Sequence, residues 1–189
     1  MSLMVMVALP NALRLVSNVA TFKTRKLIAE GIVMSKLIYL FEVWGGCENY
    51  LLRALQVLQN RALRIVTKQG NRTPIRVMLN QCGWLSVSQL VFYHSVVMLH
   101  KTRLTGFPKY LYDMYLFDDE PMRITRQSQL NLVKLRVPQI LKSELTRTGF
   151  KWRSIQCYNQ LPLSTRSLKD ITKFKQMARS WIKEYIPLE

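Results

Sequence analysis

Acidic side chains are scarce in this sequence of 189 residues. It contains 11 Asp and Glu against 28 Lys and Arg, which gives a formal net charge of +17 at pH 7. A chain with this excess needs a polyanionic neighbour or strong solvation, and phosphate is the expected counter-charge. The scarcity of acid therefore favours RNA or DNA as a partner.

Cysteine is also scarce. Cys47, Cys82 and Cys157 are odd in number and form no C-x-x-C pair. This usage argues against a disulfide framework and against a structural zinc site. We therefore expect an intracellular protein of a reducing compartment, the nucleus or the cytoplasm.

Long uninterrupted apolar runs are missing. The apolar start, Met1 to Leu9, is short, lacks a basic leader and precedes no A-x-A pattern, so a signal peptide is not expected. The longest apolar stretch, Ile28 to Trp44, contains Glu30, Lys36 and Glu42. It therefore predicts a buried helix with polar contacts, and no membrane partner is expected.

The glycine-rich loops of several enzyme classes are absent. The chain has no G-x-x-x-x-G-K-[ST], G-x-G-x-x-G or G-x-S-x-G motif, and Cys157 has no nucleophile signature around it. His94 and His100 are six residues apart, whereas metal-binding pairs on a helix are three or four apart. We expect both histidines to pack between helices or lie on the surface.

One acidic cluster is the exception, because Asp118, Asp119 and Glu120, with Asp113, hold four of the eleven carboxylates. Adjacent carboxylates point in different directions, so a divalent metal there would need distant partners. A solvated loop that pairs with Arg123 and Arg126 is the simpler interpretation. No metal, cofactor or complete catalytic site is expected.

Hydrophobic residues, in contrast, are plentiful at 49% of the chain, including 8 Tyr, 7 Phe and 4 Trp. This content is too apolar for a disordered basic tail and sufficient for a core. Helical spacing recurs along most of the chain. The predicted fold class is mainly α, a bundle of about five to seven helices, with an irregular or short-strand segment near residues 117–150.

Local signals place the predicted helices. Thr24 is a candidate N-cap for one long helix that ends at Gly45-Gly46. A second helix runs from Glu48 toward Gly70, with a stripe of apolar side chains at helical spacing. These are Leu51, Ala54, Leu55, Leu58, Ala62, Ile65 and Val66.

Three further helices are predicted downstream. A short one starts at Thr73-Pro74 and ends at Gly83. Ser86 then caps a central helix over 87–104, closed by Gly106. Asp170 caps the last helix, whose apolar face includes Phe174 and Trp181.

A change of pattern near residue 117 predicts two domains. Residues 1–116 form a helical bundle, and residues 117–189 form a C-terminal unit with a short helix near 152–159 and a final helix near 170–186. From Tyr115 to Gln129 no period of 3.6 persists, which indicates a loop or a short extended segment.

A polar and basic stripe lies on the second helix, opposite its apolar stripe. Its members fall within about 60° of one direction at 100° per residue. They are Arg53, Gln56, Asn60, Arg64 and Lys68. These side chains could simply form a solvent-exposed face without a binding role, but the net charge of the chain favours contact with phosphate.

The C-terminal unit interleaves rings with cations. Lys151 and Arg153 alternate with Phe150 and Trp152, and Lys175 follows Phe174. Such interleaving suits a groove in which bases meet rings while cations hold phosphates. Equally, Trp152 and Trp181 can be core anchors with lysines at the rim, and helical spacing favours the core for Trp181.

Several short motifs then resemble one family in their order and spacing. They read SKLIYLFEVWGG at 35–46, LQVLQNRALR at 55–64 and GWLSVSQL at 83–90, followed by PKYL at 108–111, TR at 125–126, YNQLP at 158–162 and FK at 174–175. Over about residues 12–186 the chain resembles the region downstream of the palm in the reverse transcriptases of non-LTR, LINE-type (jockey-like) retrotransposons. Tyr158 stands where that family usually has Trp.

The resemblance implies a thumb and following C-terminal region, whose helices contact the template-primer duplex behind the polymerase active site. The metal-binding carboxylates of the family lie upstream, on an aromatic-x-D-D motif and a separate Asp. Phe117-Asp118-Asp119 lacks the intervening residue and lies on the wrong side of the family's order. No catalytic role transfers to it, and the chain is expected to bind nucleic acid without polymerising it.

Two other interpretations remain open. The chain could be a protein-interaction or assembly module, whose apolar surface packs against a palm and fingers supplied upstream or in trans. Alternatively it is a degenerate remnant of an element, without independent function.

Overall fold

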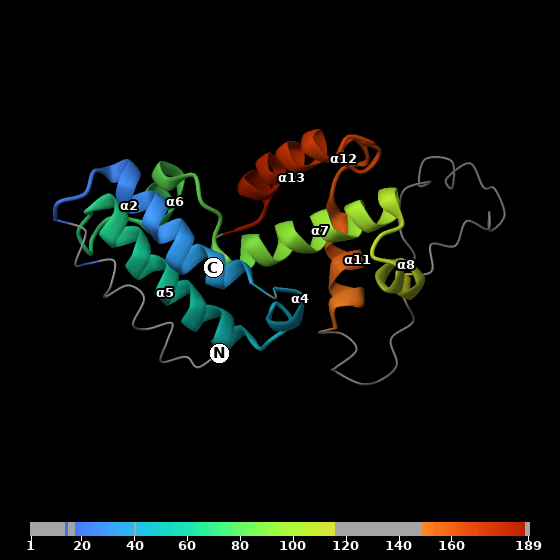
Figure 1. Cartoon of the computed structure of the whole chain (residues 1–189), viewed down its shortest axis with the longest axis horizontal. Helices are drawn as coiled ribbons and strands as arrows, with labels where there is room; N and C mark the ends of the chain where they lie inside the picture. Colours follow the sequence, from blue (N-terminus) through green and yellow to red (C-terminus); the bar gives the residue numbers. More distant parts are fainter. Residues whose placement is uncertain (1–13, 15–17, 40, 116–148, 188–189) are drawn as a thin grey trace. The chain divides into compact units, whose positions relative to one another are not determined.

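The computed structural model describes residue 14 and residues 18–39, 41–115 and 149–187. These residues are mainly helical, as the sequence predicts, and none of them forms a strand (Figure 1). Most of the segment predicted to be irregular, 117–148, lies outside the described residues, as does the cluster Asp118 to Glu120. The elements are α2 (Phe22–Ala29), η1 (Glu30–Met34), α3 (Ser35–Ile38), α4 (Phe41–Trp44), α5 (Asn49–Thr67), α6 (Ile75–Cys82), α7 (Val87–Thr105), α8 (Lys109–Tyr115), α11 (Phe150–Gln160), α12 (Leu163–Arg166) and α13 (Ile171–Tyr185).

Two compact units make up the chain. One comprises Met1–Leu90 with Leu188–Glu189, and the other comprises Val91–Pro187. The division differs from the boundary at 116/117 that the change of pattern predicts. That boundary falls at the edge of the undescribed segment and stays a prediction.

The predicted long first helix is interrupted, and it starts earlier than predicted. The side chain of Thr21, not that of Thr24, is the N-cap, and it accepts a hydrogen bond from the Thr24 amide. Residues Glu30–Met34 form a π-helical segment, and the helix ends where Tyr39 turns extended, with ψ of 125°. The Trp44 indole N–H donates to the Tyr39 carbonyl at 2.9 Å. This hydrogen bond satisfies a carbonyl that lies beyond the end of the helix.

The long helix α5 is the centre of the first unit and packs against α2, η1 and α6. Leu58, Ala62 and Val66 of the predicted stripe are buried. Buried Arg25 of α2 donates from Nε to the Val66 carbonyl at 2.9 Å and so satisfies a carbonyl of the last turn. Lys68, rather than Gly70, adopts the left-handed conformation that ends the helix, with φ of 54°.

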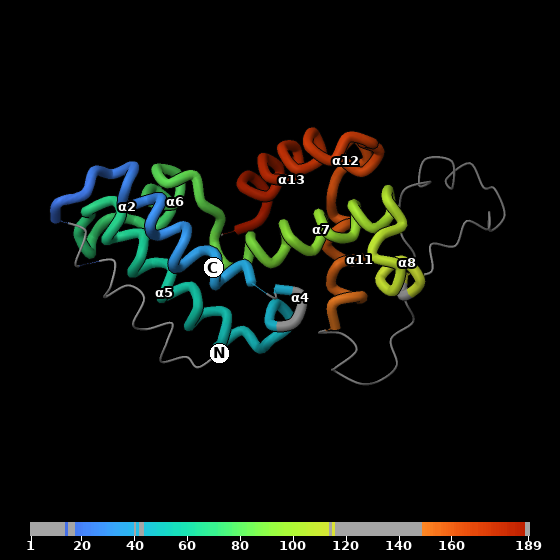
Figure 2. The backbone as a smooth tube through the Cα atoms, viewed as in Figure 1, coloured from blue at the N-terminus to red at the C-terminus, as the bar shows by residue number. Residues whose placement is uncertain are grey.

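The connection from α5 through α6 to α7 follows the predicted signals, and the backbone can be traced through it in Figure 2. Gly83 ends α6 at φ of 69°, and the Trp84 amide donates back to the Leu79 carbonyl at 2.9 Å. Ser86 and Gln89 form a reciprocal capping box, because each side chain accepts from the other residue's amide. These predictions are confirmed.

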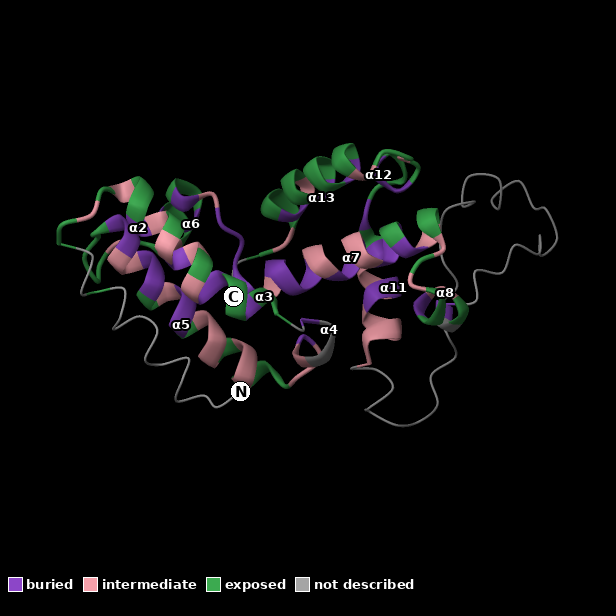
Figure 3. Ribbon diagram, in the orientation of Figure 1, coloured by how far each residue is buried: buried purple, intermediate pink, exposed green. Residues whose placement is uncertain are grey.

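In the second unit, α7 lies beside the C-terminal helices. His100 of α7 stacks on Phe174 of α13 with ring centroids 3.7 Å apart, and Tyr158 of α11 contacts both rings. Asp170 is the N-cap of α13, as predicted, and accepts from the amides of Thr172 and Lys173. One side of α13 is buried and the other is exposed (Figure 3).

Candidate nucleic-acid interface

The outward face of α5 carries a row of cations. Arg53 and Arg61 are exposed, Arg64 is half-buried, and exposed Lys68 stands at the C-terminal end of the helix. The helix contains no Asp or Glu. Arg64 Nη1 donates to the Gly70 carbonyl at 2.8 Å, which holds its guanidinium near the end of the helix.

The middle of the predicted polar stripe, in contrast, serves packing. Gln56 Nε2 donates to Asn60 Oδ1 at 2.8 Å and to Gln59 Oε1 at 2.9 Å, while Gln56 Oε1 accepts from the Val87 amide at 2.8 Å. Buried Gln59 donates in turn to the Leu85 carbonyl at 2.8 Å. Gln56 therefore fixes the start of α7 against α5, and Asn60 is held beside it.

Arg61 was missed in the sequence-based stripe because the buried face of α5 is rotated from the apolar stripe. Besides Leu58, Ala62 and Val66 of that stripe, the structure buries Gln59, Leu63 and Thr67. At 100° per residue this moves the centre of the outward face away from Gln56 and toward Arg61. The Gln-x-x-x-Asn spacing of 56 and 60 is the one signal in the sequence for a local amide pair.

The basic residues predicted in the second unit lie on two helices. Lys151 and Arg153 are half-buried on α11, and the Arg153 guanidinium lies 5.7 Å from the centre of the Phe150 ring. Lys175 is exposed on α13. The structure thus brings Arg53, Asn60, Arg64 and Lys68 together in one unit and places the other three predicted residues in the other unit.

Lys175 begins a basic row that the sequence-based prediction missed. Arg179 and Lys183 follow it at intervals of four residues on α13, and all three are exposed. Intervals of four align side chains along one side of a helix, so this spacing within the predicted last helix was the available signal. Burial first, and then the charges of Arg179 and Lys175, lower the pKa of neighbouring His94 to about 4.

The two tryptophans with alternative predicted roles are both half-buried. Trp181 lies between Phe92, at a centroid distance of 5.9 Å, and Tyr185, at 5.2 Å. The buried indole nitrogen of Trp152 has no hydrogen-bond partner among the residues that the structure describes. Trp181 is thus a packing residue that also reaches the surface.

The thiols of Cys82 and Cys157 are poorly reactive. Burial raises the pKa of the Cys157 thiol to about 12 and that of the Cys82 thiol to about 11. A thiol with such a pKa is protonated at neutral pH and is a poor nucleophile. Within residues 14, 18–39, 41–115 and 149–187, no group of three or more His, Cys, Asp or Glu is placed to hold a metal ion.

Comparison with known proteins adds no relative. No protein-family model, no curated protein and no solved structure matches the chain. In the described part of the chain, no single helix has the length and apolar character needed to cross a membrane; α6 and α7 meet the criteria only as a pair bent by 43°.

Proposed function

We propose that the chain binds the sugar-phosphate backbone of a nucleic-acid duplex through the outward face of α5. The observation that carries this proposal is the row of four cations on a helix without a single acidic residue. Such a face has nothing of its own to neutralise it, and phosphate is the polyanion that nucleic acids present at every nucleotide.

The length of the row suits a duplex strand. Arg53 and Arg64 are eleven residues apart, which is about 16 Å at a rise of 1.5 Å per residue. A strand carries one phosphate per about 3.4 Å of duplex axis, so the part of the row from Arg53 to Arg64 extends over about five base pairs. Contacts to phosphate give affinity and register without reading sequence, so the binding is proposed to be sequence-independent.

The resemblance described above gives this binding a context. The motifs at 35–46, 55–64 and 83–90 run through α3, α5 and the start of α7. We propose that residues 1–116 act as the thumb-like part of a non-LTR retrotransposon reverse transcriptase and hold the template-primer behind a palm that this segment does not contain. The chain itself then has no polymerase activity.

Binding measured over a series of salt concentrations tests the proposal. Log K for a short RNA/DNA hybrid should fall linearly with log salt, with a slope of about −0.9 for each phosphate contacted. Replacing Arg53 and Arg64 with Ala should reduce the magnitude of that slope by about 2. The matched control is the Arg72→Ala/Arg76→Ala double variant, which removes two exposed arginines of the same unit outside α5.

The control separates a defined interface from attraction by net charge. Both double variants lower the net charge equally, so an equal loss of slope in the two would contradict a site on α5. A slope near zero for the unmodified chain would contradict nucleic-acid binding altogether.

A second candidate function, a protein-interaction module, is favoured by exposed apolar side chains in the first unit. Leu27, Tyr39 and Val77 are 69%, 63% and 53% exposed. Isolated exposed apolar groups are common, and a surface that docks onto another protein has several. Binding to a polymerase palm supplied in trans, by a chain with no affinity for RNA or DNA, would select this function instead.

A further inference from the structure

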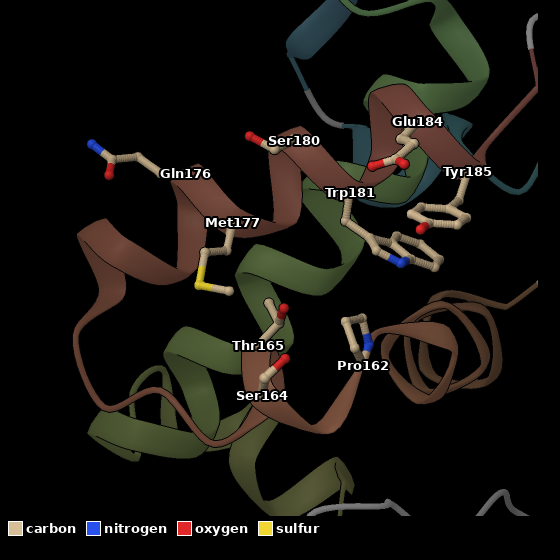
Figure 4. A pocket seen from close by; sticks show the side chains of 9 residues that line it. All are labelled: Pro162, Ser164, Thr165, Gln176, Met177, Ser180, Trp181, Glu184 and Tyr185. Atoms are coloured by element: carbon tan, nitrogen blue, oxygen red, sulfur yellow. The ribbon is translucent and has the colours of Figure 1, made fainter.

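A shallow groove lies between α12 and α13 in the second unit (Figure 4). It encloses about 350 Å³, near the lower end of the range of roughly 300–1,000 Å³ for small-molecule sites. Pro162 lines it on the α12 side, and Met177, Trp181 and Tyr185 line it on the α13 side. Ser180 and Ser164 add hydroxyl groups.

The aromatic wall of this groove is held in place on one side and open on the other. Trp181 packs on Phe92 of α7, and Tyr185 stacks on Trp181 with an angle of 20° between the rings. Tyr185 is 60% exposed although one of its faces meets Trp181. A supported ring with an accessible surface is what a planar group needs in order to stack at low entropic cost.

Charge is arranged with the acid inside the groove and the cations beside it. Glu184 lines the groove, whereas Lys173 and Lys183 are exposed on the same helix and do not line it. A carboxylate repels phosphate and accepts hydrogen bonds from amino groups, which bases carry at their edges. The groove is therefore suited to the base of a nucleotide and its surroundings to the phosphates.

We infer that this groove takes an unpaired nucleobase, which stacks against the Trp181–Tyr185 pair while Lys173 and Lys183 contact the adjoining phosphates. The inference rests on the proposed function, because it assigns a single-stranded end to a chain proposed to hold a duplex. Stacking on a ring is tolerant of sequence, since every base has a π-face. A peptide side chain would fill the apolar part of the groove but would leave the flanking lysines without a counter-charge.

Fluorescence anisotropy with two probes tests the inference. One probe is a blunt hybrid duplex, and the other is the same duplex with a four-nucleotide single-stranded overhang that carries 2-aminopurine. The chain should bind the overhang probe about fivefold more tightly or better, and the 2-aminopurine emission should fall on binding because the base stacks. Tyr185→Ala should abolish both the preference and the quenching, and Tyr185→Phe should retain them.

The matched control is Tyr110→Ala, which removes another exposed tyrosine of the same unit, on α8. It should leave the preference unchanged. Equal affinity of the unmodified chain for the two probes, or a full preference in Tyr185→Ala, would overturn the inference and leave duplex binding intact. Failure to bind either probe would overturn the proposed function as well. A dimer in sedimentation that Tyr185→Ala dissociates would overturn the inference by showing a protein occupant.

Discussion

At the scale of single residues, Tyr158 is a buried side chain of the second unit whose hydroxyl group has several hydrogen-bond partners. Its side chain is fully buried, and its hydroxyl lies 3.0 Å from His100 Nδ1. The hydroxyl also accepts from Arg103 Nη1 and donates to the Arg166 carbonyl, each at 3.3 Å. Burial raises the pKa of this tyrosine. The position is more than an aromatic packing site, because the hydroxyl joins three elements.

Tyr158→Phe should destabilise the second unit by about 1–3 kcal/mol, since it leaves buried groups without a partner while the ring stays in place. Urea unfolding should show a lower midpoint with an unchanged slope. Tyr110→Phe is the control, because Tyr110 is 70% exposed. A midpoint for Tyr158→Phe equal to that of the control would show that the hydroxyl contributes nothing net.

The two histidines make stability depend on pH. Burial lowers the pKa of His100 to about 4, and the Arg103 charge adds to this while a backbone hydrogen bond with Leu168 opposes it. The pKa of His94 is lowered to about 4 as well. With folded values below the ordinary value near 6.5, the unfolded chain binds more protons between pH 6.5 and 4. Stability is therefore complete above about pH 6.5 and declines as the pH falls through this window.

The melting temperature of the unit Val91–Pro187, which contains both histidines, should drop by several degrees between pH 7 and pH 5. About 1 kcal/mol shifts the melting temperature of a domain of 60–100 residues by roughly 4–8 °C. The double variant His94→Gln/His100→Gln should lose this dependence, even if it melts at a lower temperature throughout. Scanning calorimetry at half-unit steps of pH measures both. A chain that is equally stable at pH 5 and pH 7 would contradict the buried neutral state of these rings.

At the scale of elements, local chemistry decided which helix ends could be predicted from the sequence. Gly83, Ser86 and Asp170 act as predicted because each satisfies backbone groups within a few residues of itself. The π-helical segment, in contrast, contains a residue whose partner lies far along the sequence. Trp84 Nε1 donates to Glu30 across 54 positions of sequence.

The candidate interface was predictable to the same extent. The presence of Arg53, Arg64 and Lys68 on one helix follows from spacing alone. Which residues form the centre of the outward face does not follow from spacing. Gln59 is buried because it hydrogen-bonds to the Leu85 carbonyl, and the exposed face of the helix is therefore centred nearer to Arg61. The spacing of apolar residues does not predict that an amide side chain is buried. For this reason the packing role of Gln56 and the exposure of Arg61 were not predicted.

The end of α5 offers a test that separates stability from binding. Lys68 has a positive φ of 54°, which a side chain with a Cβ adopts at a cost and glycine adopts freely. Lys68→Gly should therefore stabilise the first unit by about 0.5–1 kcal/mol. The same change should reduce the magnitude of the salt slope of duplex binding by about 1, because it removes one phosphate contact.

Chemical denaturation and the salt series together decide the outcome. A variant that is more stable and binds with a smaller slope supports both roles of Lys68. Greater stability with an unchanged slope would remove Lys68 from the interface, and lower stability would contradict the strain at this position. Lys36→Gly, at an exposed position within α3, is the control that should lose stability.

At the scale of the whole molecule, positive charges outnumber negative ones, and the formal net charge is +17. Among the described residues, Lys26 and Glu30 form an ion pair at 3.8 Å, but α5 has no acid and α13 has one. Like charges at the surface repel one another and destabilise a compact state. The same repulsion is relieved by a polyanion, so stability and binding are coupled through charge.

This coupling predicts opposite effects of salt on the free and the bound chain. The melting temperature of the free chain should rise between about 10 mM and 150 mM NaCl, because the screening length shortens from roughly 30 Å to 8 Å. With a short hybrid duplex in excess, the melting temperature should be highest at low salt, since ligand binding to the folded chain stabilises it and salt weakens that binding.

The two curves should converge as salt increases, and an uncharged polymer at the same mass concentration should reproduce the curve of the free chain. A free chain whose melting temperature falls with added salt would show that attraction between opposite charges outweighs repulsion, and curves that stay parallel would show that the duplex is held by something other than its phosphates.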